Sequence, residues 1–233
     1  MHIVTWNCCR GPRDRKLAAL EGLAADLAVI QECPRPTSES EQSLWFGDNP
    51  RQGINVVASG AYAVRRVPAV AEVPNYAFPV TVVGPVPCQL LVVWAKYSRT
   101  YPYVEAVVRA VECYRAFIAD APTLLIGDLN SNAVWDAEHS NESNHSALVR
   151  MLSELGMVSV YHEFFHEAHG AESQPTFHLY RKRTRPYHLD YCFAPRAWLP
   201  VLRSVEIGPF EHWGAVSDHL PLRVEFELGA LEA

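Results

Sequence analysis

Residues 123–130 read TLLIGDLN, and this stretch decides how the rest of the chain is interpreted. Its first four residues are β-branched or aliphatic, which predicts a strand buried on both faces. Asp128 and Asn130 follow two positions apart, so both side chains can point to the same side of the strand end. A single Asp after a strand is most often a turn or cap residue. The segment therefore predicts a functional strand end only if other strands of the chain end in the same way.

Four other apolar runs also border an acid, an amide or a histidine. Asn7 follows 3–6, Glu32 follows 27–30, Asp190 precedes 191–194, and Asp218 and His219 lead into 222–226. Functional sites are often built where strands of a rigid scaffold end and their side chains face solvent. The five segments together hold four carboxylates, two amides and a histidine, which is too many for independent turn residues. We expect them to converge.

Four carboxylates brought close together repel one another and have raised pKa values unless a cation neutralises them. Hard oxygen ligands favour Mg²⁺ or Mn²⁺ over zinc. A magnesium site beside an Asp–His pair is suited to the cleavage of phosphoesters, because the metal offsets phosphate charge while polar side chains orient water. The pattern therefore predicts metal-dependent phosphoester chemistry.

The wider chain reads as a layered α/β domain. Strands are predicted at 3–6, 27–30, 54–58, 80–83, 90–95, 123–126, 191–194 and 222–226, and helices at 14–27, 103–119 and 144–155. Many strands with few helices favour two sheets packed together. No stretch resembles a linker, so residues 1–233 are expected to form one domain.

Composition narrows the functional classes. Twenty Lys and Arg against 26 Asp and Glu give a net charge of −6, which excludes binding of nucleic acid through bulk positive charge. The apolar runs are too short to cross a bilayer, and the N-terminus lacks the pattern of a signal peptide. The six cysteines show no C-x-x-C spacing. These features predict a reduced, cytoplasmic protein without a membrane partner or an obligate protein partner.

The ordered motifs resemble the endonuclease/exonuclease/phosphatase superfamily, the metal-dependent phosphoesterases that include DNase I-like and AP-endonuclease-like enzymes. The resemblance runs from Asn7 and Glu32 through the GDLN segment to Asp190 and the Ser217-Asp218-His219 triplet. It implies a four-layer α/β/β/α sandwich of two mainly antiparallel sheets flanked by helices. It also implies hydrolysis of a phosphodiester in DNA or RNA, with Mg²⁺ or Mn²⁺ as cofactor.

The resemblance also assigns roles to individual residues. It implies Glu32, Asn7 and Asp218 as metal ligands, and Asp128, Asn130, Asp190, His219 and Tyr97 as catalytic residues. Asp128 and Asn130 would position or deprotonate the attacking water, and His219 would bind a phosphate oxygen. The family usually has a His or Tyr at the end of the central strand, where Tyr97 stands here. A family T-H-L segment is absent, and the alternative for Tyr97 is an ordinary sheet tyrosine.

Substrate contacts are expected from Arg10 and from a basic segment that precedes Asp190. The segment contributes Arg181, Lys182, Arg183 and Arg185. Such a run is often only a solvated loop. Here it leads into a predicted site strand, so it is a candidate grip on a phosphate backbone, with Tyr180 and Tyr187 able to stack on bases.

Three other functions compete with a nuclease. One is a phosphomonoesterase or phosphodiesterase that acts on an inositol phosphate, a nucleotide or a lipid headgroup. Another is a binding module with an inactive site. The third is a zinc protease, because His162-Glu163-Phe164-Phe165-His166 matches H-E-x-x-H, although no third ligand follows at the usual spacing.

Overall fold

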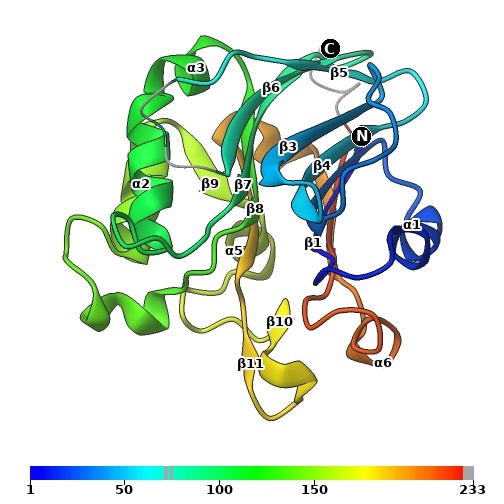
Figure 1. The fold of residues 1–233 in the computed structure, drawn as a ribbon. Helices are drawn as coiled ribbons and strands as arrows, with labels where there is room; N and C mark the ends of the chain where they lie inside the picture. The colour runs from blue at the N-terminus through cyan, green and yellow to red at the C-terminus, as the bar shows by residue number, and fades with distance from the viewer. Residues whose placement is uncertain (71–72, 74–75, 228–233) are drawn as a thin grey trace.

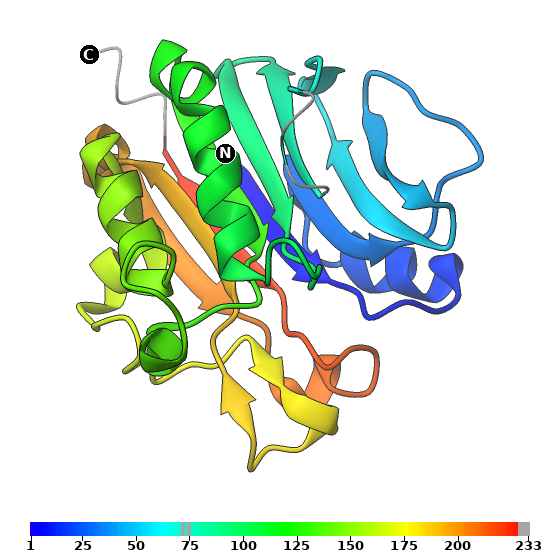
Figure 2. The ribbon, with the colours of Figure 1, turned by 60° about the vertical axis from the view of Figure 1, so that its left-hand side comes forward.

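The protein consists of two six-stranded sheets packed face to face, with helices on both outer faces (Figures 1 and 2). This architecture is seen in a computed structural model that describes residues 1–70, 73 and 76–227, except the side chains of Arg13 and Leu17. The predicted four-layer sandwich is therefore confirmed.

The first sheet has the strand order β13-β14-β1-β2-β4-β3. Its strands are β1 (His2–Asn7), β2 (Leu27–Cys33), β3 (Ser43–Asn49), β4 (Gln52–Ala58), β13 (Leu202–Ile207) and β14 (Leu222–Phe226). Only the β1–β2 pair is parallel in this sheet as described. Parallel pairing places the C-terminal ends of β1 and β2 at the same edge.

The second sheet has the order β5-β6-β7-β8-β12-β9. Its strands are β5 (Ala63–Arg66), β6 (Ala77–Val83), β7 (Cys88–Trp94), β8 (Thr123–Asp128), β9 (Met157–Ser159) and β12 (Asp190–Pro195). Within the described strands β7–β8 is the one parallel pair, so both sheets are mainly antiparallel, as predicted.

The helices lie outside the two sheets. They are α1 (Arg13–Glu21), α2 (Val104–Cys113), α3 (Arg115–Asp120), α4 (His145–Glu154), α5 (Val160–Phe165) and α6 (Phe210–Trp213). Short 3-10 helices are η1 (Ala133–Glu138), η2 (Leu179–Arg181) and η3 (Arg196–Val201). A small hairpin of β10 (Phe177–His178) and β11 (Pro186–Tyr187) projects from the same end of the sandwich as α6 (Figure 1).

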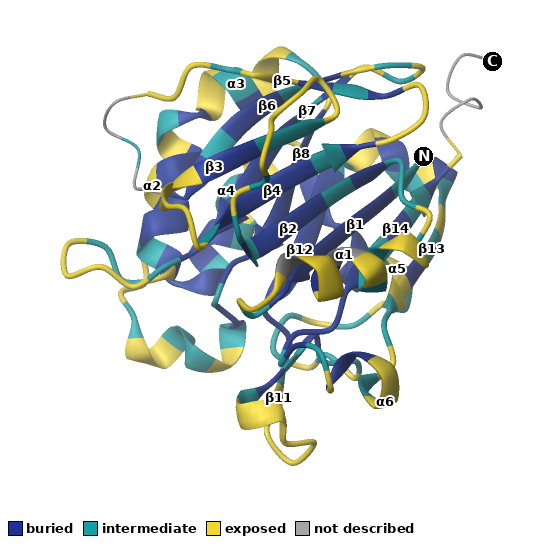
Figure 3. Ribbon diagram, turned by 45° about the vertical axis from the view of Figure 1, so that its right-hand side comes forward, coloured by how far each residue is buried: buried dark blue, intermediate teal, exposed yellow. Residues whose placement is uncertain are grey.

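Three buried hydrophobic layers hold the sandwich together. The central layer joins the facing sides of the sheets, with Ile3 and Val29 packed in the same cluster as Val92. A second layer lies between the outer face of the second sheet and α2, α3 and α4. In a third, smaller layer, Trp6 packs against Trp213 of α6, and Leu20 of α1 packs against the same cluster. Figure 3 shows the result as buried strands between helices with exposed outer sides.

All eight predicted strands are present, whereas two of the three predicted helices differ from the prediction. The helix predicted at 14–27 ends at Glu21, and residues from Leu27 enter β2 instead. The helix predicted at 103–119 divides at Tyr114, whose backbone leaves helical geometry between α2 and α3. No helix of the described chain is long and apolar enough to span a bilayer.

Candidate functional site

Strand ends from both sheets meet at one end of the sandwich. In the first sheet Asn7 pairs with Gln31, which places Glu32 next to it. In the second sheet Asp190 is the cross-strand partner of Asp128. Asn7 donates a hydrogen bond from Nδ2 to Oδ2 of Asp128 at 2.9 Å, and this bond joins the two sheets. The polar strand ends thus form one site, as their pattern predicts.

The Asp128 carboxylate is fully buried at the centre of this site. Asn130 donates its backbone N–H to Oδ1 at 2.8 Å and its Nδ2 to Oδ2 at 3.0 Å. The same Asn130 amide donates to the Ala95 carbonyl at 2.9 Å, just beyond β7. Asn7 Nδ2 also lies 3.3 Å from Glu32 Oε1, so its amide stands between two carboxylates. These contacts fix the orientation of Asp128.

His219 forms a buried pair with Asp190. Its Nδ1 lies 2.8 Å from Oδ2 of Asp190, and its Nε2 lies 3.9 Å from Oδ2 of Asp128. Burial alone would lower the pKa of the imidazole. The charges of Asp190 and Asp128 outweigh burial and raise the pKa of His219 to about 9. The imidazole is therefore protonated at neutral pH and presents a positive charge beside Asp128.

The buried charges of the site suit a cation. Burial, opposed by the His219 charge and reinforced by Asp190, raises the pKa of Asp128 above its usual range. Oδ1 of Asp190 is buried and has no hydrogen-bond partner among the described residues. One ligand atom each from Asp128, Asp190 and His219 lies within 4.8 Å of the others. Carboxylate and amide oxygens dominate the site, and such a donor set fits Mg²⁺ or Mn²⁺.

The rim of the site carries Asp218 and two arginines. Arg10 donates from Nε to Oε2 of Glu32 at 3.1 Å, so this arginine neutralises a predicted metal ligand. Asp218 is hydrogen-bonded to the Cys9 thiol, whose pKa is raised by burial and by this carboxylate. Arg181 donates to Cys9 Sγ at 4.0 Å, which brings the start of the basic segment to the rim.

The other cations of the basic segment lie in different surroundings. Arg183 forms an ion pair with Glu211 on α6, and its guanidinium lies 4.9 Å from the ring centre of Phe210. Lys182 and Arg185 are exposed and form no ion pair with any residue that the structure describes. The segment therefore divides into one docked arginine, one paired arginine and two solvent-facing cations.

Tyr97 stands apart from the buried network. Its side chain is 64% exposed, and its ring centre lies 5.8 Å from that of Tyr103. No hydrogen bond links Tyr97 to Asp128 or Asn130 in the described part of the chain. Its neighbour Lys96 points away, with Nζ 4.0 Å from the Tyr76 ring centre. A role for Tyr97 at a phosphate stays a prediction.

An aromatic pocket of about 450 Å³ adjoins the site and includes Asn130 in its wall. Trp135 and Tyr187 line it with ring centres 4.9 Å apart, and Phe177 lies 4.6 Å from the His219 ring. The sequence suggests Tyr187 as a stacking residue, but it gives no signal for Trp135 or Phe177. Trp135 lies 52 positions before Tyr187, and only the fold brings them together.

Two hydroxyl side chains that sequence reasoning did not single out support the site. Thr176 Oγ1 accepts hydrogen bonds from the backbone N–H groups of Leu189 and Asp190 at 2.9 and 3.0 Å. Ser217 donates to the Asn7 carbonyl at 2.7 Å and accepts from the His219 N–H at 3.0 Å. The position of Ser217 beside Asp218 and His219 is the only sequence signal for either residue.

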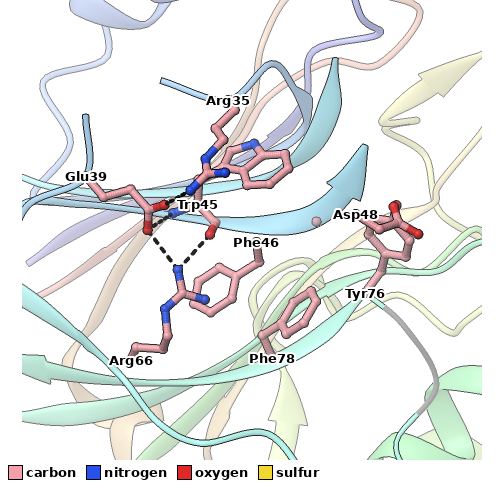
Figure 4. A pocket seen from close by; sticks show the side chains of 9 residues that line it. Arg35, Glu39, Trp45, Phe46, Asp48, Arg66, Tyr76 and Phe78 are labelled. Carbon is pink, nitrogen blue, oxygen red and sulfur yellow. Dashed lines mark hydrogen bonds and ion pairs between the residues drawn. The ribbon is translucent and has the colours of Figure 1, made fainter. Parts of the chain in front are cut away.

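A second hollow, of about 390 Å³, lies between β3 and β6 (Figure 4). Arg35 and Arg66 both pair there with Glu39, at 3.1 and 2.8 Å. The rings of Phe46 and Phe78 stack with centres 4.7 Å apart. Its charges and rings are thus engaged with one another, and we assign this hollow no ligand.

The H-E-x-x-H segment does not form the arrangement of a zinc protease. Helix α5 ends at Phe165, and His166 takes a left-handed conformation with φ of 54°. Glu163 instead lies 3.8 Å from Arg196. His162 turns toward His169, and their ring centres lie 3.5 Å apart. The pair of imidazoles one helical turn apart that this motif requires is therefore absent from the described segment.

Comparison with solved structures supports the fold. A 3′ phosphatase (NExo) from Neisseria bound to a product DNA hairpin has a TM-score of 0.71 and 20% identity, covering 97% of this chain and 99% of that chain. The endonuclease domain of TRAS1, a telomere-specific retrotransposon, has a TM-score of 0.69 and 16% identity, with 97% and 98% coverage. An AP endonuclease from Archaeoglobus fulgidus has a TM-score of 0.67 and 16% identity, with 97% and 99% coverage.

These similarities show that the chain has the DNase I-like fold, as the motif resemblance predicts. No protein-family profile and no curated protein sequence matches the chain.

Proposed function

We propose that the protein is a divalent-metal-dependent phosphodiesterase that cleaves nucleic acid. The observation that carries this proposal is the junction of the two sheets, where Asp128 is held by Asn7 and Asn130 and faces the protonated His219. A phosphoester needs groups that orient water and groups that stabilise charge on the phosphate. Both kinds of group converge here.

The metal is assigned to the oxygen ligands at the ends of the first sheet. Glu32, Asn7 and Asp218 are the residues proposed to hold Mg²⁺ or Mn²⁺, with water completing the coordination. A divalent ion at this position supplies positive charge that offsets the charge of the scissile phosphate. Asn7 Nδ2 lies between Glu32 Oε1 and the buried Asp128 Oδ2, and the closeness of these two carboxylates supports the assignment.

The chain's own residues account for the rest of the chemistry. Asp128 accepts a proton or a hydrogen bond from the attacking water, while Asn130 keeps that carboxylate oriented. His219 donates from Nε2 to a phosphate oxygen and stabilises the charge that develops there. Asp190 holds the ring through Nδ1, which fixes the direction of Nε2.

Substrate selection is assigned to the aromatic pocket and the basic segment. A base or sugar next to the scissile phosphate fits against Trp135 and Tyr187, because these rings line the pocket beside Asn130. The structural neighbours include a 3′ phosphatase bound to a product DNA hairpin and an AP endonuclease, which favours DNA as the polymer. Tyr97 is proposed to contact the phosphate from the rim.

A phosphomonoesterase is the second candidate, and a specific comparison favours it. The neighbour from Neisseria is named as a 3′ phosphatase and was solved with product DNA. Such an enzyme would use the same buried site but remove a terminal phosphate. The two functions differ in the product released, which is inorganic phosphate in one case and a shortened or nicked polymer in the other.

The decisive experiment is a hydrolysis panel of single-stranded DNA, duplex DNA, abasic duplex, RNA, 3′-phosphorylated DNA and small phosphoesters. Each substrate is tested with Mg²⁺, Mn²⁺ or EDTA. We expect one of the polymers to be cleaved in the presence of metal and not in EDTA. Asp128→Asn should slow this cleavage by about a hundredfold or more. Val134→Ala, an exposed position beside the pocket, should leave the rate unchanged.

Each other outcome has a definite meaning. Release of phosphate from 3′-phosphorylated DNA without chain cleavage would select the phosphomonoesterase. Turnover restricted to small phosphoesters would remove nucleic acid as the substrate. A folded protein that is inactive on the whole panel with both metals would overturn the enzyme assignment.

A further inference from the structure

A second group of ligand-type side chains lies in the segment between β9 and β10. It consists of His162 on α5 together with His169 and Glu172 from the loop that follows. One ligand atom from each of the three lies within 4.8 Å of the others. His162 Nε2 is 3.1 Å from Glu172 Oε1. Ligand atoms around a tetrahedral zinc ion are roughly 3.3 Å apart for bonds of about 2 Å, so the His162–Glu172 pair has this spacing and His169 lies within reach of it.

Both imidazoles are oriented through the nitrogen that faces away from the group. His162 Nδ1 lies 2.7 Å from Ser159 Oγ, and His169 Nδ1 lies 3.0 Å from His145 Nε2. A further hydrogen bond joins His145 Nδ1 to Ser131 Oγ at 3.0 Å. Metal-binding histidines characteristically have such a partner on the second nitrogen, which fixes the tautomer and the ring direction. Nε2 of His162 thereby faces Glu172 Oε1, and Nε2 of His169 has no hydrogen bond with a described residue.

One oxygen of the Glu172 carboxylate accepts several hydrogen bonds. Its Oε1 accepts from the Gly170 N–H at 3.0 Å and from Asn132 Nδ2 at 3.0 Å, in addition to the contact with His162. Oε2 has no hydrogen bond with a described residue. The carboxylate is therefore positioned by its first oxygen and offers its second.

The group is also reachable from solvent. His162 and His169 line a hollow of about 340 Å³ whose wall also includes the exposed His166. An ion can enter by this route, and water can occupy a fourth position. Two imidazoles and one carboxylate form a borderline ligand set that favours Zn²⁺ over Mg²⁺.

We propose that His162, His169 and Glu172 form a Zn²⁺ site separate from the phosphoesterase centre. The ion fastens the 169–172 loop to α5. Through Asn132, which donates both to Glu172 and to the His188 carbonyl at 3.1 Å, the site also supports the strand that presents Asp190. The role assigned to the ion is structural.

The test is Zn²⁺ binding by metal-stripped protein in excess Mg²⁺, measured by calorimetry and by the content of zinc after dialysis. We expect one Zn²⁺ per wild-type chain. His169→Gln and Glu172→Gln should each weaken binding by a hundredfold or more. Ser159→Ala, which removes the partner of His162 Nδ1, should weaken it by about 10- to 100-fold.

Three measurements keep the test independent of folding and of the active site. His212→Gln, an exposed histidine on α6, and Asp128→Asn should both bind Zn²⁺ like the wild type. Co²⁺ should give the visible absorption of a tetrahedral complex in the wild type and in these two controls, but not in His169→Gln or Glu172→Gln. Zn²⁺ should raise the unfolding temperature of the wild type but not of His169→Gln.

Two results would overturn the proposal. One is a wild-type protein that retains no Zn²⁺ and shows no change in unfolding temperature at micromolar metal. The other is a folded Glu172→Gln variant, verified by circular dichroism, that binds Zn²⁺ as tightly as the wild type.

Discussion

His219 Nδ1 lies 2.8 Å from Oδ2 of Asp190, and both side chains are buried at the junction of the two sheets. Thr176 and Ser217 hold the backbone on either side of this pair. The pair is therefore built into the scaffold before any substrate binds. In the proposed mechanism, the charge of His219 stabilises the phosphate.

The Asp190–His219 pair should make stability depend on pH in metal-free protein. The pKa of His219 is about 9 in the folded chain, above the value of about 6.5 for an unperturbed histidine. A raised pKa stabilises the folded protein fully below pH 6.5, and this contribution is lost as the pH rises through 9. Urea unfolding in EDTA should therefore give a free energy of unfolding that falls between pH 6.5 and 9.5.

Variants separate this contribution from others. Asp190→Asn removes the negative charge beside the ring, so the imidazole of His219 should titrate at a lower pH in NMR spectra. His212→Gln should keep the wild-type pH dependence, because His212 is exposed on α6. A wild-type His219 that titrates near 6.5 would contradict the prediction.

Gly127 of the GDLN segment should not tolerate substitution by a residue that has a side chain. Its φ is 146°, and a Cβ there would lie 1.8 Å from the carbonyl oxygen of Val93, its partner in the β7–β8 pair. Gly127→Ala should lower the free energy of unfolding by about 2 kcal/mol or more. Gly22→Ala, with open space around the position, should change it by less than about 1 kcal/mol. Chemical denaturation measures both, and equal effects would refute the packing argument.

The strands and their polar ends could be predicted because their signal is local. Apolar runs such as 123–126 and 191–194 are typical of strands that are buried on both faces. The acid next to each run, Asp128 or Asp190, therefore lies at one end of its strand. The convergence of Asp128 with Asp190 then depends only on which strands are neighbours. The roles of these residues in catalysis and the single-domain organisation stay predictions.

Features that depend on where a helix stops or how a loop returns could not be predicted. Apolar residues recur at helical spacing from 103 to 119, but the backbone leaves helical geometry at Tyr114 and forms two helices. His162 and His166 have helical spacing, yet α5 ends between them and the loop brings His169 to His162 instead. Trp135 meets Tyr187 across 52 positions, for which periodicity carries no information.

The aromatic pocket should determine how tightly a polymer binds. Trp135→Ala removes one wall of the pocket beside Asn130. Stacking of one base is worth about 1–3 kcal/mol, so KM for the preferred polymer should rise by about tenfold or more. The kcat should change little, because Trp135 does not contact Asp128 or His219. Val134→Ala, on the same 3-10 helix and exposed, is the matched control. A loss confined to kcat would place Trp135 in the chemistry and contradict this assignment.

The basic segment should act through its two solvent-facing cations rather than through all four. Arg181 is docked against Cys9 and Arg183 is paired with Glu211, whereas Lys182 and Arg185 face solvent on the hairpin end of the sandwich. A cation that neutralises one phosphate of duplex DNA contributes about 0.9 to the slope of log affinity against log salt concentration. Lys182→Ala and Arg185→Ala should each weaken binding and reduce the slope by about this amount.

The control for this experiment is Arg115→Ala on α3, which lies at the opposite end of the molecule from the hairpin (Figure 1). It makes the same change in net charge but should leave the slope unchanged, since the effect of a distant surface charge is screened at physiological salt. A small phosphoester should be hydrolysed equally well by all three variants, because it offers no neighbouring phosphates. If Arg115→Ala reduces the slope as much as Arg185→Ala, attraction depends on overall charge and the segment is an ordinary solvated loop.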